Sequence, residues 1–135
     1  MTGTAVLASY LCRDHVALAR FYADAFGWTT VEAVQSPLFT ALDSGRFVLG
    51  FHHDDAHDLL DIGDRRGQVG SRMHLTIDVG TFADVDAKVA PLTGLGATVV
   101  KAPFTTYYDA RQVVFEDPEG NLFRISSAQT GVSDL

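Results

Sequence analysis

Apolar residues in the first half of the chain recur at two spacings, one typical of an amphipathic helix and one typical of strands. A helical stripe follows Asp14, which can cap the first turn, and stops at Gly27. The stripe consists of Leu18, Phe21, Tyr22, Ala25 and Phe26. Shorter apolar runs, separated by Pro, Gly and Ser, predict strands around this helix. The predicted strands cover residues 5–11, 28–34, 39–42 and 46–52.

The second half of the chain repeats this order of elements. Residues 72–79 alternate strictly, which predicts a strand with apolar residues on one face and His74, Thr76 and Asp78 on the other. A second helical stripe follows, made of Phe82, Val85, Val89 and Leu92. Pro91 is expected to disturb the last turn of that helix, because proline has no N–H to donate. The remaining predicted strands lie at residues 97–103 and in the two arms of a hairpin over 112–126.

The hairpin is specified by its turn, residues 117–120, with the sequence Asp-Pro-Glu-Gly. The aspartate accepts backbone hydrogen bonds, the proline presets φ and the glycine relieves the fourth position, which is the type I signature. The strand after the turn carries Arg124 among apolar residues, and burying a guanidinium without a partner is costly. Arg124 therefore either grips an anionic or carbonyl group of a ligand or pairs with an internal acid such as Glu116 or Asp78. Its position favours a cavity.

The two halves of the chain align with each other. Residues 26–31 match 95–100, and residues 44–47 match 119–122. This repetition predicts an α+β fold of two βαβββ modules whose sheets form a curved, incomplete barrel with the helices outside and a concave surface for a ligand. The modules cover about residues 5–52 and 72–127 of a single domain, 1–135, with a linker over 53–71.

Composition and charge exclude several partners. The 135 residues are 47% hydrophobic and carry a formal net charge of −7, and the ten basic residues are scattered, so we expect no nucleic acid and no anionic membrane surface as partner. The apolar run 5–12 has no basic residue before it and is too short for a signal sequence, so the predicted location is cytoplasmic. Cys12 is the only cysteine, which excludes an intrachain disulfide, and a single cysteine at a strand end is expected to be a small buried side chain rather than a nucleophile.

Two segments carry a resemblance to a known family. They are residues 114–122, with the sequence VFEDPEGNL, and residues 21–28, which contain Phe-Tyr followed by Phe-Gly-Trp. With the repeated strand-helix-strand-strand-strand order, the chain resembles the vicinal oxygen chelate superfamily, which contains glyoxalase I, bleomycin-resistance proteins and extradiol dioxygenases. The resemblance implies a glyoxalase-like fold, a homodimer and a ligand site inside the curved sheet.

The resemblance also implies where a metal would bind. Metal-dependent members place His or Glu ligands on the first and last strands of each module. Here the second module offers His74 and Arg124, and the first module offers only positions near Leu7–Ser9 and Leu49–Gly50. A guanidinium and apolar side chains are poor ligands for a divalent metal. We therefore expect no metal and no other cofactor, with His74 lining a pocket rather than acting as a ligand or a purely structural residue.

A further histidine-rich run lies in the predicted linker. His53 and His57 are four residues apart, which would align them for a metal on a helix, but the segment is polar all round. We interpret it as a solvated loop.

The candidate ligand-binding residues combine polar anchors with flat aromatic side chains at strand ends. They are His74, Arg124, Tyr107, Tyr108, Phe39, Phe51, Leu49, Gln112 and Thr76. Core burial is an equal alternative for Phe39 and Phe51. The predicted function is binding and sequestration of a small, largely aromatic molecule, of the antibiotic-resistance type, in a metal-free pocket. The alternative is a glyoxalase-type lyase or isomerase, or a dioxygenase-like enzyme, with an altered metal site or with His74 as a general base.

Overall fold

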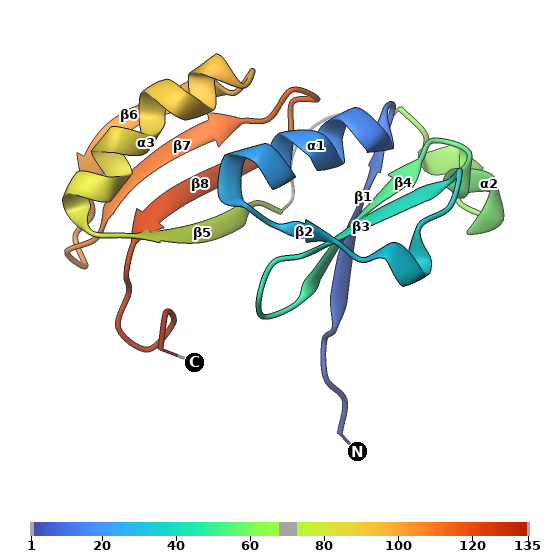
Figure 1. Ribbon diagram of the computed structural model, residues 1–135, viewed down its shortest axis with the longest axis horizontal. Helices are drawn as coiled ribbons and strands as arrows, with labels where there is room; N and C mark the ends of the chain where they lie inside the picture. The colour runs from blue at the N-terminus through green and yellow to red at the C-terminus, as the bar shows by residue number, and fades with distance from the viewer. Residues whose placement is uncertain (1, 68–72, 135) are drawn as a thin grey trace. The chain divides into compact units, whose positions relative to one another are not determined.

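The computed structural model describes residues 2–67 and 73–134. The chain divides into two compact units, Met1–Val69 and Gly70–Leu135. Each unit contains a four-stranded mixed sheet, with strand orders β1-β4-β3-β2 and β5-β8-β7-β6 (Figure 1). The two orders are equivalent when the strands are counted within each unit. The predicted α+β organisation of two βαβββ modules is therefore confirmed.

The first unit begins with a strand and the helix that covers its sheet. Its elements are β1 (Leu7–Cys12), α1 (His15–Phe26), β2 (Thr29–Thr30), β3 (Phe39–Asp43) and β4 (Val48–His53). The carboxylate of Asp14 accepts a hydrogen bond from the Ala17 N–H at 3.0 Å, as its capping role predicts. Gly27 ends α1 in the left-handed region with φ 72°, where glycine has no steric penalty.

The second unit has the same order of elements. They are β5 (Leu75–Gly80), α3 (Phe82–Gly94), β6 (Thr98–Thr105), β7 (Arg111–Glu116) and β8 (Leu122–Ser127). Strand β5 pairs parallel to β8, and β8 pairs antiparallel to β7. The α3 face of this sheet carries fully buried side chains on paired positions of β7 and β8, which are Val113 opposite Ile125 and Phe115 opposite Phe123. Alternation along the strands places Gln112 and Arg124 on the opposite face.

The predicted hairpin turn is confirmed in detail. The Gly120 N–H donates to the Asp117 carbonyl at 2.9 Å, and Gly120 has φ 85°. The Asp117 side chain is buried and accepts hydrogen bonds from the N–H groups of Glu119 and Asn121, each at 2.9 Å. The side-chain amide of Asn121 adds another at 2.9 Å. This turn fixes the pairing of β7 with β8.

Several predicted element boundaries are wrong. The strand expected over 28–34 is reduced to β2, because the chain turns into the 3₁₀ helix η1 (Glu32–Val34). Strand β5 starts at Leu75, so Met73 and His74 precede it, while Arg72 lies outside the described residues. The end of helix α3 is not among these errors, because the helix contains Pro91 near its end and stops at Gly94.

The segment expected to be a linker contains structure of its own. It forms the short helix α2 (Ala56–Leu59) and the 3₁₀ helix η2 (Gly63–Arg65). Ala56 and His57 are buried, while residues 68–71 lie outside the described part of the chain. Helix α2 belongs to the first unit and carries two buried side chains, so this segment is folded rather than a plain connection.

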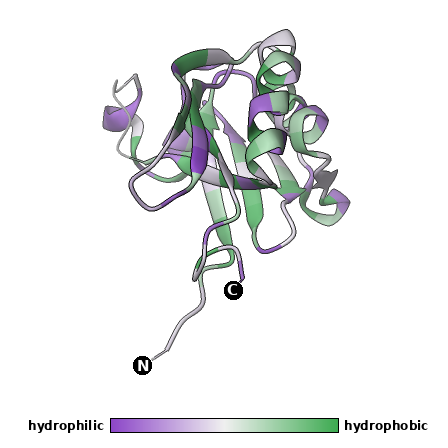
Figure 2. Ribbon diagram, turned by 90° about the vertical axis from the view of Figure 1, so that its left-hand side faces the viewer, coloured by the Kyte–Doolittle hydropathy of each residue, from purple (hydrophilic) through white to green (hydrophobic). Residues whose placement is uncertain are grey.

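Hydrophobic and hydrophilic stretches alternate along the helices, as Figure 2 shows. The buried residues of α1 include Leu18, Phe21 and Tyr22, which confirms the predicted stripe. In α3 the buried residues are Val85 and Leu92, whereas Phe82 is 43% exposed. Phe82 is the first residue of the helix, where its ring can turn away from the sheet. Within the described residues, no helix is long and apolar enough to cross a membrane.

Candidate functional site

Four of the predicted ligand-binding residues come together on the face of the second sheet that is opposite α3. Thr76 lies on β5, Gln112 on β7 and Arg124 on β8, and Tyr108 lies in the turn between β6 and β7. The parallel pairing of β5 with β8 places Thr76 directly beside Arg124, although they are 48 residues apart in the sequence. We call Thr76, Tyr108, Gln112 and Arg124 the Arg124 cluster.

Hydrogen bonds hold the guanidinium of Arg124 in one orientation. Its Nε donates to the Thr76 hydroxyl at 2.7 Å, and its Nη1 donates to the Gln112 Oε1 at 3.2 Å. A longer contact of 3.5 Å joins Nη1 to the Tyr108 hydroxyl. All three partners are neutral. No described residue accepts a hydrogen bond from Nη2, so both hydrogens of this nitrogen lack an acceptor among the described residues.

Gln112 is fixed by buried partners on its other side. Its side chain is fully buried, and its Nε2 donates to the Ser126 hydroxyl oxygen at 3.1 Å. That hydroxyl donates its own hydrogen to the Ser127 carbonyl at 2.8 Å and accepts a second hydrogen bond from Gln129 at 3.0 Å. Since the Ser126 oxygen can only accept from Gln112, the amide nitrogen must face Ser126 and the amide oxygen must face Arg124. Ser126 and Gln129 were not predicted, because nothing in their local sequence distinguishes them from ordinary polar residues.

The predicted internal acids do not pair with Arg124. Asp78 accepts a hydrogen bond from the Gly80 N–H at 2.9 Å, and both Asp78 and Glu116 are exposed. Within residues 2–67 and 73–134, no carboxylate forms an ion pair with Arg124. By contrast, Arg111 on the same sheet pairs with Asp86 of α3 at 2.9 Å. The charge of Arg124 is therefore not neutralised by a described side chain.

Two other predicted residues lie near the cluster in sequence. Tyr107 is 99% exposed, and its ring meets that of Tyr108 edge-on at a centroid distance of 4.9 Å. Tyr108 itself is 43% exposed. His74 is exposed and precedes β5, and no hydrogen bond or ion pair joins it to another described residue. The tyrosines therefore offer aromatic surface beside a cation, whereas His74 stands outside the cluster.

The aromatic candidates of the first unit divide between two faces. Phe51 is fully buried, with ring centroids 5.7 Å from Tyr22 of α1 and 6.0 Å from Tyr10. Leu49, two residues away on the same strand, is also buried and shares this face. Both belong to the core under α1, so their assignment to a ligand-binding surface is wrong. Phe39 lies on the other face, where its ring is 4.5 Å from that of His52.

The strands of the first unit do not fit a divalent metal. Ser9 and Gly50 are paired neighbours on the face away from α1, and glycine has no side chain to donate. A Cβ at Gly50 would meet the Ser9 hydroxyl and lie 2.6 Å from the Phe39 ring, so a ligating side chain would not fit there without rearrangement. In the second unit the equivalent strand carries the guanidinium of Arg124. No group of three or more His, Cys, Asp or Glu side chains within the described residues is arranged to hold a metal.

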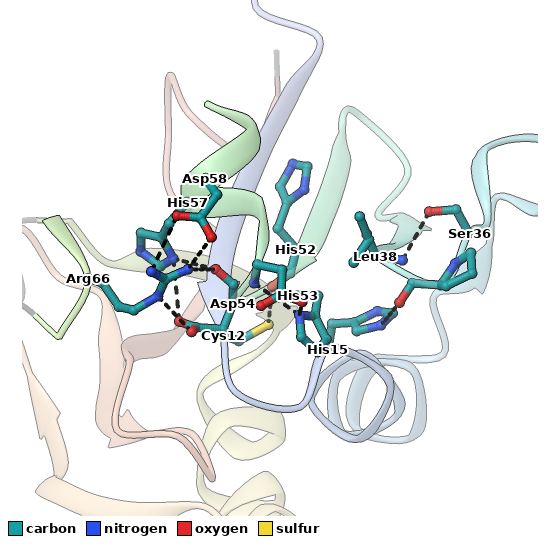
Figure 3. A network of polar contacts seen from close by, with 12 residues as sticks. Cys12, His15, Ser36, Leu38, His52, His53, Asp54, His57, Asp58 and Arg66 are labelled. Atoms are coloured by element: carbon teal, nitrogen blue, oxygen red, sulfur yellow. Dashed lines mark hydrogen bonds and ion pairs between the residues drawn. The ribbon is translucent and has the colours of Figure 1, made fainter. Parts of the chain in front are cut away.

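The histidine-rich run lies at the end of β4 and in α2, as Figure 3 shows. His53 ends the strand while His57 lies in α2, so the two are not on one helix and cannot act as an i, i+4 pair. The Nδ1 of His57 is 2.7 Å from the Asp54 carbonyl oxygen. Arg66 pairs with Asp54 at 2.8 Å and with Asp58 at 3.4 Å. This run is a folded loop held by ion pairs, and the prediction that it is only solvated is wrong for His57, which is buried.

A polar cluster that was not predicted lies at the start of α1. The Nε2 of His15 is 2.9 Å from the Pro37 carbonyl, and its Nδ1 is 2.9 Å from the Thr40 hydroxyl. Because a carbonyl can only accept, Nε2 carries the hydrogen and Nδ1 accepts from Thr40 in the neutral ring. A cavity of about 220 Å³ lies beside it, between α1 and β3, and Thr40 and Gln35 form part of its wall. A lone histidine after a capping residue gives no sequence signal for this arrangement.

The repeated strand order defines a class of protein built from two βαβββ modules. Residues 5–126 match the family model described as a glyoxalase-like domain. The chain belongs to this family, within the glyoxalase, bleomycin resistance protein and dioxygenase superfamily.

Solved structures support this membership. A glyoxalase/bleomycin resistance protein/dioxygenase family enzyme from Burkholderia phytofirmans PsJN is 36% identical, with a TM-score of 0.89, and the match covers 91% of this chain and 97% of that one. Lactoylglutathione lyase from Agrobacterium tumefaciens is 21% identical, with a TM-score of 0.72 and coverage of 94% and 95%. Fosfomycin resistance protein FosX from Mesorhizobium loti is 15% identical, with a TM-score of 0.67 and coverage of 96% and 95%. The last two show the shared fold alone. No match was found among curated proteins.

Proposed function

We propose that this protein binds and sequesters a small, largely aromatic molecule at the Arg124 cluster, in the manner of a resistance protein and without a metal ion. The supporting observation is a fixed guanidinium, with two donors on Nη2 that have no described acceptor, in contact with Tyr108. The ring of Tyr108 in turn meets the exposed ring of Tyr107. Flat aromatic rings stack on planar ligands, and a few placed polar groups orient them. Aromatic rings and oriented polar groups are sufficient for binding a ligand, and binding needs no catalytic residue.

The metal-free part of the proposal rests on electrostatics. A guanidinium about 4 Å from a divalent ion, at an effective dielectric constant of about 20, adds repulsion of about 8 kcal/mol. One exposed histidine, His74, would not offset this. Protein purified without a metal-affinity step should contain no stoichiometric zinc, nickel, manganese or iron by elemental analysis. Near one equivalent of metal, lost on chelation together with a glyoxalase-type activity, would instead support the enzymatic alternative.

A thermal-shift screen tests the binding function. Flavins, polycyclic antibiotics and glutathione adducts are the ligand sets to compare. A ligand that binds only the folded state stabilises it by about 2.7 kcal/mol at 100 times its dissociation constant, which is a readily measured shift. Stabilisation by planar aromatic compounds, and not by aliphatic glutathione adducts, is the expected pattern.

Substitutions at Tyr108 locate the site of any ligand found in this way. We expect Tyr108→Ala to weaken binding by about 1 to 3 kcal/mol, because it removes the stacking surface. The matched variant Tyr108→Phe keeps the ring and loses only the hydroxyl contacts with Gln112 and Arg124, so it should bind almost as well. Isothermal titration calorimetry measures both. Unchanged affinity in Tyr108→Ala would remove this residue from the site.

We also propose that the protein is a homodimer. In the described residues, β1 and β2 are the edges of one sheet and β5 and β6 are the edges of the other, and unpaired strand edges invite a partner. Strand β6 is long and carries the exposed Val99 and Val100. Light scattering should give twice the monomer mass at micromolar concentration, and a monomer there would contradict the proposal.

A further inference from the structure

We infer that the Arg124 cluster binds an oxyanion, so that the molecule sequestered by this protein carries a carboxylate, or a sulfonate of similar geometry, beside its aromatic body. This inference rests on the proposed function and names the chemical class of its ligand. The argument depends on which donors of the cluster are used, how firmly they are oriented, and what charge surrounds them.

The groups left for a ligand are donors. The Nη2 of Arg124 has no described acceptor for its two hydrogens. The Thr76 hydroxyl oxygen accepts from Arg124 Nε at 2.7 Å, and its own hydrogen has no acceptor within the described residues. The amide oxygen of Gln112 is already occupied by Arg124 Nη1 and by the Tyr108 hydroxyl, at 3.2 and 3.3 Å. A ligand group at this place therefore meets N–H and O–H donors, which suits a group that only accepts.

The guanidinium is preorganised for such a group. An oxyanion can meet a guanidinium along the edge formed by Nε and Nη2 or along the edge formed by Nη1 and Nη2. The first edge is blocked, because Nε already donates to Thr76. The second edge remains accessible, because Nη2 has no described acceptor and the contact of Nη1 with Tyr108 is long at 3.5 Å. Two parallel N–H donors match the two oxygens of a carboxylate. The buried Gln112, held by Ser126, keeps the guanidinium turned this way.

The surrounding charge points in the same direction. The three partners of Arg124 are neutral, whereas Arg111 and Arg66 are each paired with aspartates. Arg124 is half-buried, so water screens its charge less than at a fully exposed site. The acids on the same face, Asp78 and Glu116, are exposed and make no ion pair with it. A half-buried guanidinium without a counter-ion is completed most favourably by an anion from outside.

Three matched probes test the inference: naphthalene-2-carboxylate, naphthalene-2-sulfonate and naphthalene-2-carboxamide. They share one aromatic body and differ in charge. Isothermal titration calorimetry on the full chain should show both anions binding about tenfold or more tightly than the neutral amide, since hydrogen bonds to charged groups are stronger than neutral ones. The preference should weaken as salt rises, because the site is only half-buried.

Two variants of equal charge change locate the effect. Arg124→Gln should remove the preference for the anions, whereas Arg111→Gln, which removes a positive charge that is already paired, should keep it. A third variant, Gln112→Glu, places a carboxylate against Nη1 and supplies the missing counter-ion internally, so it should also abolish the preference. Urea denaturation of each variant establishes that it is folded.

The possible results separate this inference from the proposed function. Equal binding of all three probes, weakened by Tyr108→Ala, would keep the aromatic site and overturn the oxyanion inference. Loss of the preference in Arg111→Gln as well as in Arg124→Gln would also overturn it, because the effect would then follow net charge. Absence of binding by all three probes at millimolar concentration would overturn the inference and the proposed function together. Anion preference that only the Arg124→Gln and Gln112→Glu variants lose would establish it.

Discussion

Replacement of Asp117 by alanine should destabilise the second unit substantially. The carboxylate is buried and accepts hydrogen bonds from Glu119 N–H, Asn121 N–H and the Asn121 side chain, each at 2.9 Å. A hydrogen bond to a charged group contributes about 1.5 to 3 kcal/mol. Because both donor residues are half-buried, water can replace part of these bonds in the variant. The expected loss of unfolding free energy is therefore about 2 to 4 kcal/mol, less than the sum of the three hydrogen bonds.

The internal repeat supplies a matched control for this substitution. Asp43 begins the equivalent turn of the first unit, but it is exposed and its carboxylate accepts one hydrogen bond, from Gly45 N–H at 2.8 Å. The backbone of that turn is also held by a bond from Ser44 N–H to the Phe47 carbonyl at 3.1 Å. Asp43→Ala removes the same charge and should lower stability by less than about 1 kcal/mol. Urea denaturation followed by circular dichroism compares the two variants.

Equal losses in the two variants, or a loss below about 1 kcal/mol for Asp117→Ala, would refute this reasoning. The first result would mean that the lost charge, and not the turn, sets the stability. The second would mean that solvent replaces the carboxylate in full. A loss confined to Asp117→Ala would establish that the buried turn stabilises the pairing of β7 with β8.

Two further predictions concern the first unit. Gly50→Ala should lower the free energy of unfolding by about 1 to 3 kcal/mol, because the new Cβ would lie 2.6 Å from the Phe39 ring. The control is Gly94→Ala in the second unit, where no atom lies within 4 Å of the added Cβ. In a thermal melt, this control should unfold close to the temperature of the unmodified protein. Burial, and secondarily the nearby His15, lowers the pKa of His52 below its usual value of 6.5. The unfolded chain therefore binds a proton more readily than the folded one, and stability should fall as the pH drops below about 6.5. In His52→Asn the fall in stability between pH 7 and 5 should be smaller, which midpoints of urea denaturation at each pH measure. An unchanged pH dependence would contradict the attribution of this fall to His52.

The sequence by itself determined the repeated modules and their local elements. Helix α1 begins after Asp14 and ends at Gly27, as predicted, because a capping carboxylate and a left-handed glycine act within a few residues of the chain. The Asp-Pro-Glu-Gly turn is equally local, since each residue meets a conformational requirement of its own position. Element ends were less predictable: β2 stops after Thr30 although the apolar residues continue.

The tertiary structure alone decided which side chains share a face and a site. Phe39 and Phe51 look alike in the sequence, but the register of β3 on β4 turns Phe51 under α1 and Phe39 to the other face. A shift of one residue in that pairing would exchange the two faces. Thr76 and Arg124 meet only because β5 pairs parallel to β8 in a single register across 48 residues. The sequence identifies the arginine in a buried strand, and the long-range pairing determines which neutral side chains surround it.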